Sequence, residues 1–461
     1  MKQVFAALAR HAAERPTATA FREADRAITW AELAREVGTR AAALRHPPAV
    51  LGIALSGIDY VIADLAAVLA GRRVVPVPSF FSPAQVQHLL RDAGAELLDQ
   101  LPRPNAHPLP LDYAGGADRV IYTSGTTGQP KGVVLGDRQL EVSCAGLAAA
   151  LRPDASDRYL SVLPQAQLLE QICGIFLPIL AGAETLICSE GLAALLSGDG
   201  VGLARTAEDF GPSMTVLSPR QLALWVAALR QGRARAPARL RYVAVGGAPT
   251  SPALLDQARS FGLPAAEGYG LSEACSVVAL TPADGAAMQV IEGVSVRLEA
   301  GEIVVSGPTV MQGYLHGDAV QGEWRTGDLG QIENGALRVL GRRDAMILRQ
   351  SGRNIAPEWV EAAALADPAV PFAALVQVAG DRLVLVLAPF AAPDMQGLVA
   401  RLSALPLYAR PDHVLIADPR LPGLIRPSGL MDRAVARDSA CAREAEWISL
   451  RERSQDERRL A

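Results

Sequence analysis

The sequence predicts an α/β protein whose sheets are mainly parallel. Residues 1–95 alternate helical patterns with short apolar strands, and the alternation returns after residue 150. Half of the residues are hydrophobic, which is typical of a soluble globular protein. The length of 461 residues exceeds what one core usually supports, so we expect two or more domains.

Hydrophobic periodicity places the individual elements. Residues 1–10 predict an amphipathic helix, not a signal peptide, because charged residues follow at once where a cleavage region would lie. We expect further helices over residues 31–44 and 60–69, and strands over residues 50–55, 74–77, 159–162, 184–188, 214–217 and 242–245. Residues 293–310 alternate polar and apolar positions, which predicts β-structure. Residues 436–461, rich in Arg and Glu, predict a solvated helical tail.

Composition excludes several classes of function. The formal net charge of −4 gives no sign of a nucleic-acid partner. The five cysteines and six histidines are dispersed, so the sequence indicates neither a zinc site nor a disulfide framework, and a cytoplasmic location is expected. The longest apolar stretch, residues 172–183, is too short to span a bilayer, so no membrane span is expected.

The most informative segment is a glycine- and hydroxyl-rich loop over residues 122–132. It holds Lys131, one of only two lysines in a chain that otherwise uses arginine. A compact ammonium on a slim stem suits crowded phosphate oxygens. Glycines let backbone N–H groups approach a ligand, and the hydroxyls can donate to phosphate or help hold a hydrated metal. The spacing is not that of a Walker A loop, and a merely flexible turn explains the full pattern poorly.

Four segments in order resemble motifs of the adenylate-forming, or AMP-binding, enzymes, which include acyl-CoA synthetases, peptide-synthetase adenylation domains and luciferases. They are the phosphate loop (123–132), the adenine and magnesium motif (268–273), the ribose motif (324–328) and the hinge (341–344). The resemblance is to the acyl-CoA synthetase and long-chain acyl-CoA ligase branch. It implies a large ATP- and acyl-binding domain, residues 1–340, and a small mobile α+β lid domain, residues 341–461.

The resemblance also implies the cofactors and the roles of single residues. ATP, Mg²⁺ and either coenzyme A or the phosphopantetheine of an acyl carrier protein are expected. Catalytic roles fall to Lys131 at the phosphates, Glu273 at the magnesium together with Thr126, Arg342 at the ribose or α-phosphate, and Asp344 at the hinge. The expected ATP site comprises Thr123, Ser124, Gly125, Thr126, Thr127, Gly128, Lys131, Gly247, Ala248, Pro249, Gly268, Tyr269, Gly270, Ser272, Asp328 and Arg342.

In this site Tyr269 would stack on adenine, Ser272 would contact the α-phosphate or the substrate carboxylate, and Asp328 would accept ribose hydroxyls. The side-chain-poor turn over residues 246–249 would lie against the purine. Taken alone, Glu273 would more often be a surface carboxylate, but behind this motif the functional interpretation is favoured. A plain strand-to-turn transition is the less favoured interpretation of residues 246–249.

The acid substrate is expected to lack an α-amino group. Residues 163–170 resemble the border of the acyl pocket, and no aspartate stands between Val162 and Leu169 to pair with an ammonium. Five apolar residues suggest an apolar lining, although core packing explains them equally well: Leu168, Leu169, Ile172, Val277 and Val278.

One position departs from the family pattern. Leu430 stands where the family usually has a lysine that bridges the carboxylate and the α-phosphate, and no lysine follows Lys131. Arg426 or Arg433 could serve instead, adenylation could be slow, or this half-reaction could be lost.

The sequence therefore predicts ATP-dependent activation of an apolar, fatty or aromatic acid as acyl-AMP, followed by transfer to a pantetheine thiol. Residues 351–354 would line the approach of that thiol. An amide-forming ligase and a weakened nucleotide-binding partner protein are the alternatives. The basic cluster from Arg230 to Arg241 is interpreted as a solvated loop in preference to a site for a carrier protein or the phosphates of coenzyme A.

Overall fold

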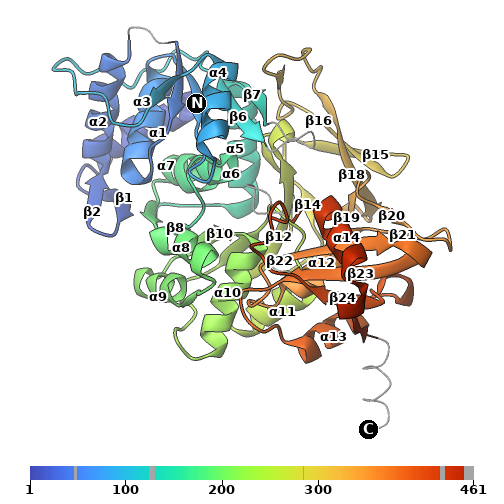
Figure 1. The fold of residues 1–461 in the computed structure, drawn as a ribbon. Helices are drawn as coiled ribbons and strands as arrows, with labels where there is room; N and C mark the ends of the chain where they lie inside the picture. The colour runs from blue at the N-terminus through green and yellow to red at the C-terminus, as the bar shows by residue number, and fades with distance from the viewer. Residues whose placement is uncertain (46–48, 124–129, 284, 426–430, 451–461) are drawn as a thin grey trace.

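The computed structural model describes residues 1–45, 49–123, 130–283, 285–425 and 431–450. Within these ranges the strands form five sheets. The N-terminal helices lie at one end of the molecule and the C-terminal sheet lies toward the other (Figure 1). The α-helices of these ranges are α1 (Lys2–Glu14), α2 (Trp30–Ala43), α3 (Gly57–Leu69), α4 (Pro83–Ala93), α5 (Asp137–Leu151), α6 (Leu168–Glu170), α7 (Leu177–Ala181), α8 (Ser189–Ser197), α9 (Val201–Phe210), α10 (Pro219–Arg230), α11 (Pro252–Ser260), α12 (Pro357–Leu365), α13 (Met395–Ser403) and α14 (Arg433–Ala442).

The six-stranded sheet carries the hydroxyl-rich loop. Its order is β17 (Gly313–Tyr314), β7 (Lys131–Leu135), β6 (Arg119–Thr123), β4 (Arg73–Pro76), β3 (Val50–Ile53) and β5 (Glu96–Leu98). The pairs from β6 to β5 are parallel, whereas β7 is antiparallel to both β6 and β17. Thr123 is the partner of Lys131 across the β6–β7 pair, so the loop leaves and re-enters the sheet at adjacent positions.

The nine-stranded sheet forms the centre of the chain. Its order is β14 (Gln289–Val290), β13 (Ser276–Leu280), β12 (Ala265–Leu271), β11 (Tyr242–Val245), β10 (Met214–Leu217), β8 (Arg158–Ser161), β9 (Glu184–Ile187), β1 (Thr19–Glu23) and β2 (Arg26–Thr29). The strands from β12 to β1 are parallel, and antiparallel pairs close both edges. In parallel strands the carboxyl ends share one edge, where ligands usually bind.

An antiparallel sheet leads from this centre to the C-terminal part of the chain. It contains β15 (Ser295–Glu299), β16 (Glu302–Ser306), β18 (Glu323–Glu333) and β19 (Ala336–Arg342). Strand β19 runs through the boundary predicted at residue 341, so that division of the chain stays a prediction.

The C-terminal sheet is covered on both faces. It consists of β22 (Phe372–Val378), β23 (Arg382–Ala388), β24 (His413–Ile416) and β25 (Ile448–Ser449), and a short pair, β20 (Ile347–Leu348) with β21 (Asn354–Ile355), precedes it. Alternate residues of β23 enter two different cores, as expected for side chains that point to opposite faces of a strand. One core includes α12 and α13, and the other includes α14.

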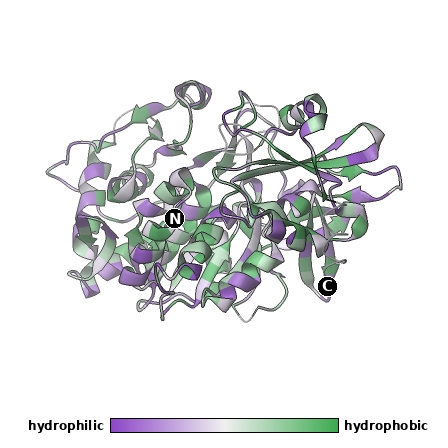
Figure 2. Ribbon diagram, turned by 60° about the horizontal axis from the view of Figure 1, so that its bottom comes forward, coloured by the Kyte–Doolittle hydropathy of each residue, from purple (hydrophilic) through white to green (hydrophobic). Residues whose placement is uncertain are grey.

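Local sequence signals explain where several helices begin. Helices α2, α4 and α10 start after Thr29, Ser82 and Ser218, and each cap forms a reciprocal capping box with a Glu or Gln three residues later. Figure 2 shows hydrophobic segments along the inner strands and hydrophilic ones along outer helices and loops. Local capping and the apolar pattern therefore agree with the same fold.

Most elements expected from periodicity are confirmed to within a few residues at their ends. Residues 214–217 and 242–245 are β10 and β11, and residues 293–310 contain β15 and β16. Residues 2–14 form the predicted amphipathic helix, with Val4, Phe5 and Leu8 buried.

The expectation of a solvated helical tail over residues 436–461 is wrong for its described part. Helix α14 buries Ala436 and Ala440 against the C-terminal sheet, and β25 adds a strand to that sheet. Small apolar residues among the charged ones give α14 a packing face, which the density of Arg and Glu concealed. Residues 451–461 lie outside the described part.

The apolar stretch over residues 172–183 belongs to the core. It forms most of the π-helix η1 (Gln171–Phe176) and α7, with Ile172 and Phe176 fully buried. In the described ranges, no helix is both long and apolar enough to cross a membrane.

Glu170 is a buried carboxyl at the start of this stretch. Its Oε2 accepts a hydrogen bond from the Tyr159 hydroxyl at 3.5 Å, and its Oε1 has no hydrogen-bond partner. Burial raises the pKa of Glu170 from 4.5 to about 8. The folded protein therefore keeps a proton that the unfolded chain releases above pH 4.5, and the associated stability is lost as the pH rises through about 8.

We expect Glu170→Gln, which stays neutral at every pH, to remove much of this pH dependence. Relative to the natural protein, the variant should gain stability between pH 5 and pH 8, measured by urea unfolding at both values. Glu14→Gln, at an exposed position of α1, is the control. Parallel stability curves for Glu170→Gln and the natural protein would show that Glu170 is ionised in the fold.

Candidate functional site

A cavity of about 450 Å³ lies at the carboxyl ends of the parallel strands and extends along them. One end is formed by Thr123 of β6, by the glycine-rich turn after β11 and by the glycines of β12. The other end reaches Met214 and Tyr242, the first residues of β10 and β11. A strand rises about 3.3 Å per residue, so the cavity follows roughly 10 Å of sheet.

The first end holds six of the sixteen residues predicted to bind a nucleotide. Those that line the cavity are Thr123, Gly247, Gly268, Tyr269, Gly270 and Ser272. Gly247 has a φ of +83°, and an added Cβ would meet no atom within 4 Å, so this turn presents bare backbone. Ala248 and Pro249 are exposed and do not line the cavity, so their role in binding a ligand stays a prediction.

Tyr269 and Asp328 connect the predicted adenine and ribose motifs. The Tyr269 hydroxyl donates to Asp328 Oδ2 at 2.6 Å, and Arg342 Nη1 lies 3.3 Å from the other carboxylate oxygen. Burial raises the pKa of Asp328, and the contacts with Tyr269 and Arg342 oppose that rise. Arg342 Nε also pairs with Asp344 at 3.1 Å. Three separate segments of the sequence thus converge on one carboxylate.

Lys131 and Glu273 both lie close to Tyr314. Lys131 Nζ is 5.6 Å from the centre of the Tyr314 ring, and the Tyr314 hydroxyl donates to Glu273 Oε1 at 2.9 Å. Strand β17 holds Tyr314 beside β7, with the Leu315 amide donating to Gly132 at 2.8 Å. The Met311 amide donates to the Glu273 carbonyl, also at 2.8 Å. The 311–315 segment therefore contacts both the strand that carries Lys131 and the residue Glu273.

This arrangement fits a magnesium ion bound chiefly through a substrate's phosphates. Carboxylate oxygen is a hard ligand of the kind that Mg²⁺ prefers, and Mg²⁺ usually takes only one or two protein carboxylates. In the described part of the chain, no three His, Cys, Asp or Glu side chains gather into a metal cage. Glu273 would be the protein's anionic ligand.

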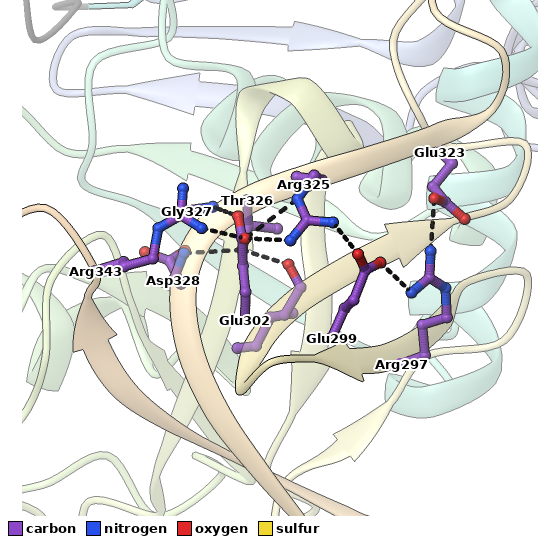
Figure 3. Close-up of polar contacts among 10 residues, drawn as sticks. Arg297, Glu299, Glu302, Glu323, Arg325, Thr326, Gly327, Asp328 and Arg343 are labelled. Carbon is purple, nitrogen blue, oxygen red and sulfur yellow. Dashed lines mark hydrogen bonds and ion pairs between the residues drawn. The ribbon is translucent and has the colours of Figure 1, made fainter.

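A buried carboxylate, Glu302, bonds the backbone of β18 at Gly327, next to Asp328 (Figure 3). Its Oε2 accepts from Arg325 Nη2 at 2.7 Å and from Arg343 Nη1 at 2.8 Å, and its Oε1 accepts from the Gly327 amide at 3.0 Å. Burial favours the neutral form of Glu302, but hydrogen bonds from Arg325 and Gly327 outweigh it, so its pKa is lowered. Glu302 therefore remains ionised while it accepts the hydrogen bond from the Gly327 amide.

Much of the remaining cavity wall is apolar. Leu168, Leu169 and Val277 line it, as predicted, whereas Ile172 and Val278 are buried in the core and do not. Further lining comes from residues whose role the sequence did not indicate: Phe80, Phe81, Leu147, Leu151, Cys173, Leu177, Met214, Tyr242 and Ala244. Among these residues, the adjacent Phe80 and Phe81, which lie between two prolines, are the sequence feature that could have indicated an apolar cavity wall.

Several predicted residues take no part that can be described. Ser124, Gly125, Thr126, Thr127 and Gly128 lie outside the described residues, as do Arg426 and Leu430.

Arg433 is held by ion pairs. It pairs with the buried Glu361 and, at 2.9 Å, with Glu358. All three residues follow the hinge, so the pairs would move with the lid. Arg433 is therefore a poor replacement for the missing lysine.

The basic cluster is not one free surface. Arg241 Nη2 pairs with Asp157 at 2.7 Å, and Arg239 Nη2 donates to the Ser156 carbonyl at 2.9 Å. Arg239 and Arg241 link the segment that leads into β11 to the turn before β8, so their role here is structural. Arg230, Arg233 and Arg235 are exposed, as the solvated-loop interpretation expects.

Comparison with known proteins agrees with this geometry. The model of the AMP-binding enzyme family matches residues 8–107 and 119–315, more than half of the chain. A 2-succinylbenzoate–CoA ligase of Bacillus licheniformis is 31% identical over 277 residues, 55% of each chain. A feruloyl-CoA synthase of an Amycolatopsis species is 30% identical over 431 residues, 81% of this chain and 85% of the relative. The match with the succinylbenzoate ligase thus spans only about half of that relative.

Solved structures show the same fold. The O-succinylbenzoate coenzyme A synthetase of Bacillus subtilis, in complex with AMP, superposes with a TM-score of 0.75 at 24% identity, over 93% of this chain and 97% of that one. An anthranilate CoA ligase in complex with anthranoyl-AMP gives a TM-score of 0.79 at 18% identity, over 95% and 97%. The predicted α/β class, with a large N-terminal part and a small C-terminal α+β part, is confirmed.

Proposed function

The chain belongs to the AMP-binding enzyme family, and we propose that it is an AMP-forming acid–thiol ligase for an apolar carboxylic acid. The observation that carries the proposal is the single cavity with two unlike ends. Its glycine-rich end is joined to Tyr269, Asp328 and Arg342, and its other end is apolar. A nucleotide and an acyl group bound there would meet near Thr123 and Ser272.

In the first step a carboxylate oxygen would attack the α-phosphorus of ATP, and the bond to pyrophosphate would break. Lys131 would neutralise charge on the phosphates, and the phosphate-loop hydroxyls would donate to their oxygens. Magnesium, when bound, supplies Lewis-acid charge neutralisation. Tyr314 would hold Glu273 in place for that ion.

In the second step a thiol would attack the acyl carbon of acyl-AMP, release AMP and leave a thioester. Asp328 would keep the ribose fixed through both steps, because its carboxylate accepts hydrogen bonds. A turn of the C-terminal part about Asp344 would let one cavity serve both steps. The names of the relatives favour coenzyme A as acceptor and acids with an aromatic ring.

Leu430 favours a second candidate, a nucleotide-binding partner that has lost efficient adenylation. The commitment of Arg433 to Glu358 and Glu361 adds to this case. The intact nucleotide end of the cavity supports the working enzyme more strongly.

The test is to incubate the protein with Mg·ATP, a panel of aromatic and aliphatic acids, and coenzyme A, a carrier protein or amines. We expect AMP, pyrophosphate and a thioester. Glu273→Gln should lose activity by about 10²-fold or more, because it removes the anionic magnesium ligand with little change in shape. Release of ADP would refute adenylation. Binding of ATP without turnover would favour the partner protein, and thiol-independent amide formation would favour the amide ligase.

Tyr314→Phe removes only the hydroxyl that donates to Glu273. We expect the Mg²⁺ concentration for half-maximal activity to rise about 10-fold, the scale of one hydrogen bond to a charged group. Tyr408→Phe, in the C-terminal part, is the matched control. An unchanged Mg²⁺ dependence in the Tyr314 variant would show that its hydroxyl does not position Glu273.

Ala244→Phe places a ring in the apolar half of the cavity, where Ala244 of β11 lines the wall. Bulky acids should lose kcat/KM by about 10-fold or more, whereas acetate or propionate and ATP binding should be little affected. The control is Ala238→Phe at an exposed loop position. Equal losses for large and small acids would place the acyl group elsewhere.

A further inference from the structure

We propose that Glu302 and Arg343 form a clamp that fixes the start of the hinge, so that the C-terminal part turns only at residues after Arg343. The inference rests on the proposed function, in which that part acts as a lid. It assigns positioning roles to two residues that do not line the cavity.

The clamp consists of contacts between the predicted hinge (residues 341–344) and the ribose motif (residues 324–328). The Arg343 amide donates to the Gly327 carbonyl at 2.8 Å, and Arg342 Nη1 donates to the Thr326 carbonyl at 2.8 Å. The Arg343 side chain turns the other way and donates to Glu302 at 2.8 Å. The backbone of Arg343 thus bonds Gly327 directly, and its side chain bonds Glu302, which in turn bonds the Gly327 amide.

Glu302 is itself held in place by several contacts. Its side chain is 2% exposed, and it bonds the Gly327 amide and two arginines at once. A chain of surface ion pairs extends outward from Arg325 through Glu299 and Arg297 to Glu323 (Figure 3). A buried carboxylate that is hydrogen-bonded on both oxygens cannot shift without leaving a partner unsatisfied.

The contacts change character immediately after Arg343. Asp344 pairs with Arg342, and the Ala345 amide donates to the Arg342 carbonyl, so both bonds are local. Ile347 then pairs with Ile355 and packs against the core that contains α12 and α13. The chain thus passes from one anchored body to another across residues 344–346, and this is where rotation would be concentrated.

The alternative is that Glu302 merely neutralises Arg325 at the edge of the sheet. The Arg343 side chain is 60% exposed, so in that case its removal would change little. The two accounts therefore differ in what Arg343→Ala does.

The experiment compares kcat and the KM for ATP with the spread of lid positions. Cys441 is an exposed cysteine of α14, whereas the other four cysteines are buried, so it accepts a spectroscopic label. Asp209→Cys, at an exposed position of α9, accepts the second label. Distances between the labels are measured in the full chain, with and without Mg·ATP.

In Arg343→Ala we expect a broader distance distribution and a kcat lowered about 10-fold, with the KM for ATP changed less than twofold. Arg343→Lys should restore part of both, because it keeps a cation near Glu302. Arg297→Ala breaks neighbouring surface pairs without touching Glu302, and it should behave as the natural protein. Glu302→Gln should match Arg343→Ala if the variant folds.

A natural-like kcat and distance distribution in Arg343→Ala would overturn the clamp. A loss of thermal stability confined to Glu302→Gln, with Arg343→Ala unaffected, would overturn it as well. If the natural protein releases no AMP with any acid, the proposed function fails instead. The distance distribution needs no turnover and would still decide the clamp.

Discussion

One buried ion pair holds the strand that leads into the phosphate loop. Arg119 opens β6, and its guanidinium meets Asp64 of α3 in two parallel contacts of 2.6 and 2.9 Å. Both side chains are buried, and the Arg119 guanidinium lies 5.4 Å from the centre of the Phe176 ring. Loss of either partner of such a pair typically costs about 3–5 kcal/mol, because it leaves an uncompensated charge. The position of β6, and of Lys131 paired across from it, depends on this contact.

The site is assembled by contacts between strands of different sheets. Strand β17 belongs to the six-stranded sheet and brings Tyr314 to Glu273, which follows β12 of the nine-stranded sheet. Strand β18 of the third sheet brings Asp328 to Tyr269 of β12. The adenine and ribose motifs thus meet directly through Tyr269 and Asp328. Glu273 and Lys131 both contact Tyr314, which lies outside the four motifs.

The absence of the family's lysine at Leu430 and the ion pairs that hold Arg433 both bear on how this chain would adenylate an acid. Arg433 is held by two carboxylates of its own part of the chain, and the buried one, Glu361, also accepts the Leu375 amide at 2.7 Å. Burial raises the pKa of Glu361 to about 7, and the Arg433 charge opposes that rise. If Arg433 left for an active site, Glu361 would lose its counter-charge. With Arg433 held by these carboxylates, adenylation would depend on other cations, Lys131 and Arg342.

Sequence reasoning placed the strands well where a run was short, apolar and bounded by turns. It failed at the C-terminus, where charge density hid the packing face of α14 and the edge strand β25. It also found only part of the acyl wall. Leu168 and Ile172 have the same apolar character in the sequence, yet one lines the cavity and the other is core. Periodicity reports that a side chain is buried, not which neighbour it meets.

The sequence by itself determined the fold class, the order of the motifs and most of the groups able to bind phosphate, because these follow from local spacing and side-chain chemistry. Only the tertiary structure decided that Tyr314 contacts both Lys131 and Glu273, and that Glu302 bonds both Arg343 and the Gly327 amide next to Asp328. Tyr314 is 41 positions from Glu273 in the sequence, and Arg343 is also 41 positions from Glu302. Contacts over such separations are set by how the sheets pack, and no local pattern records that packing.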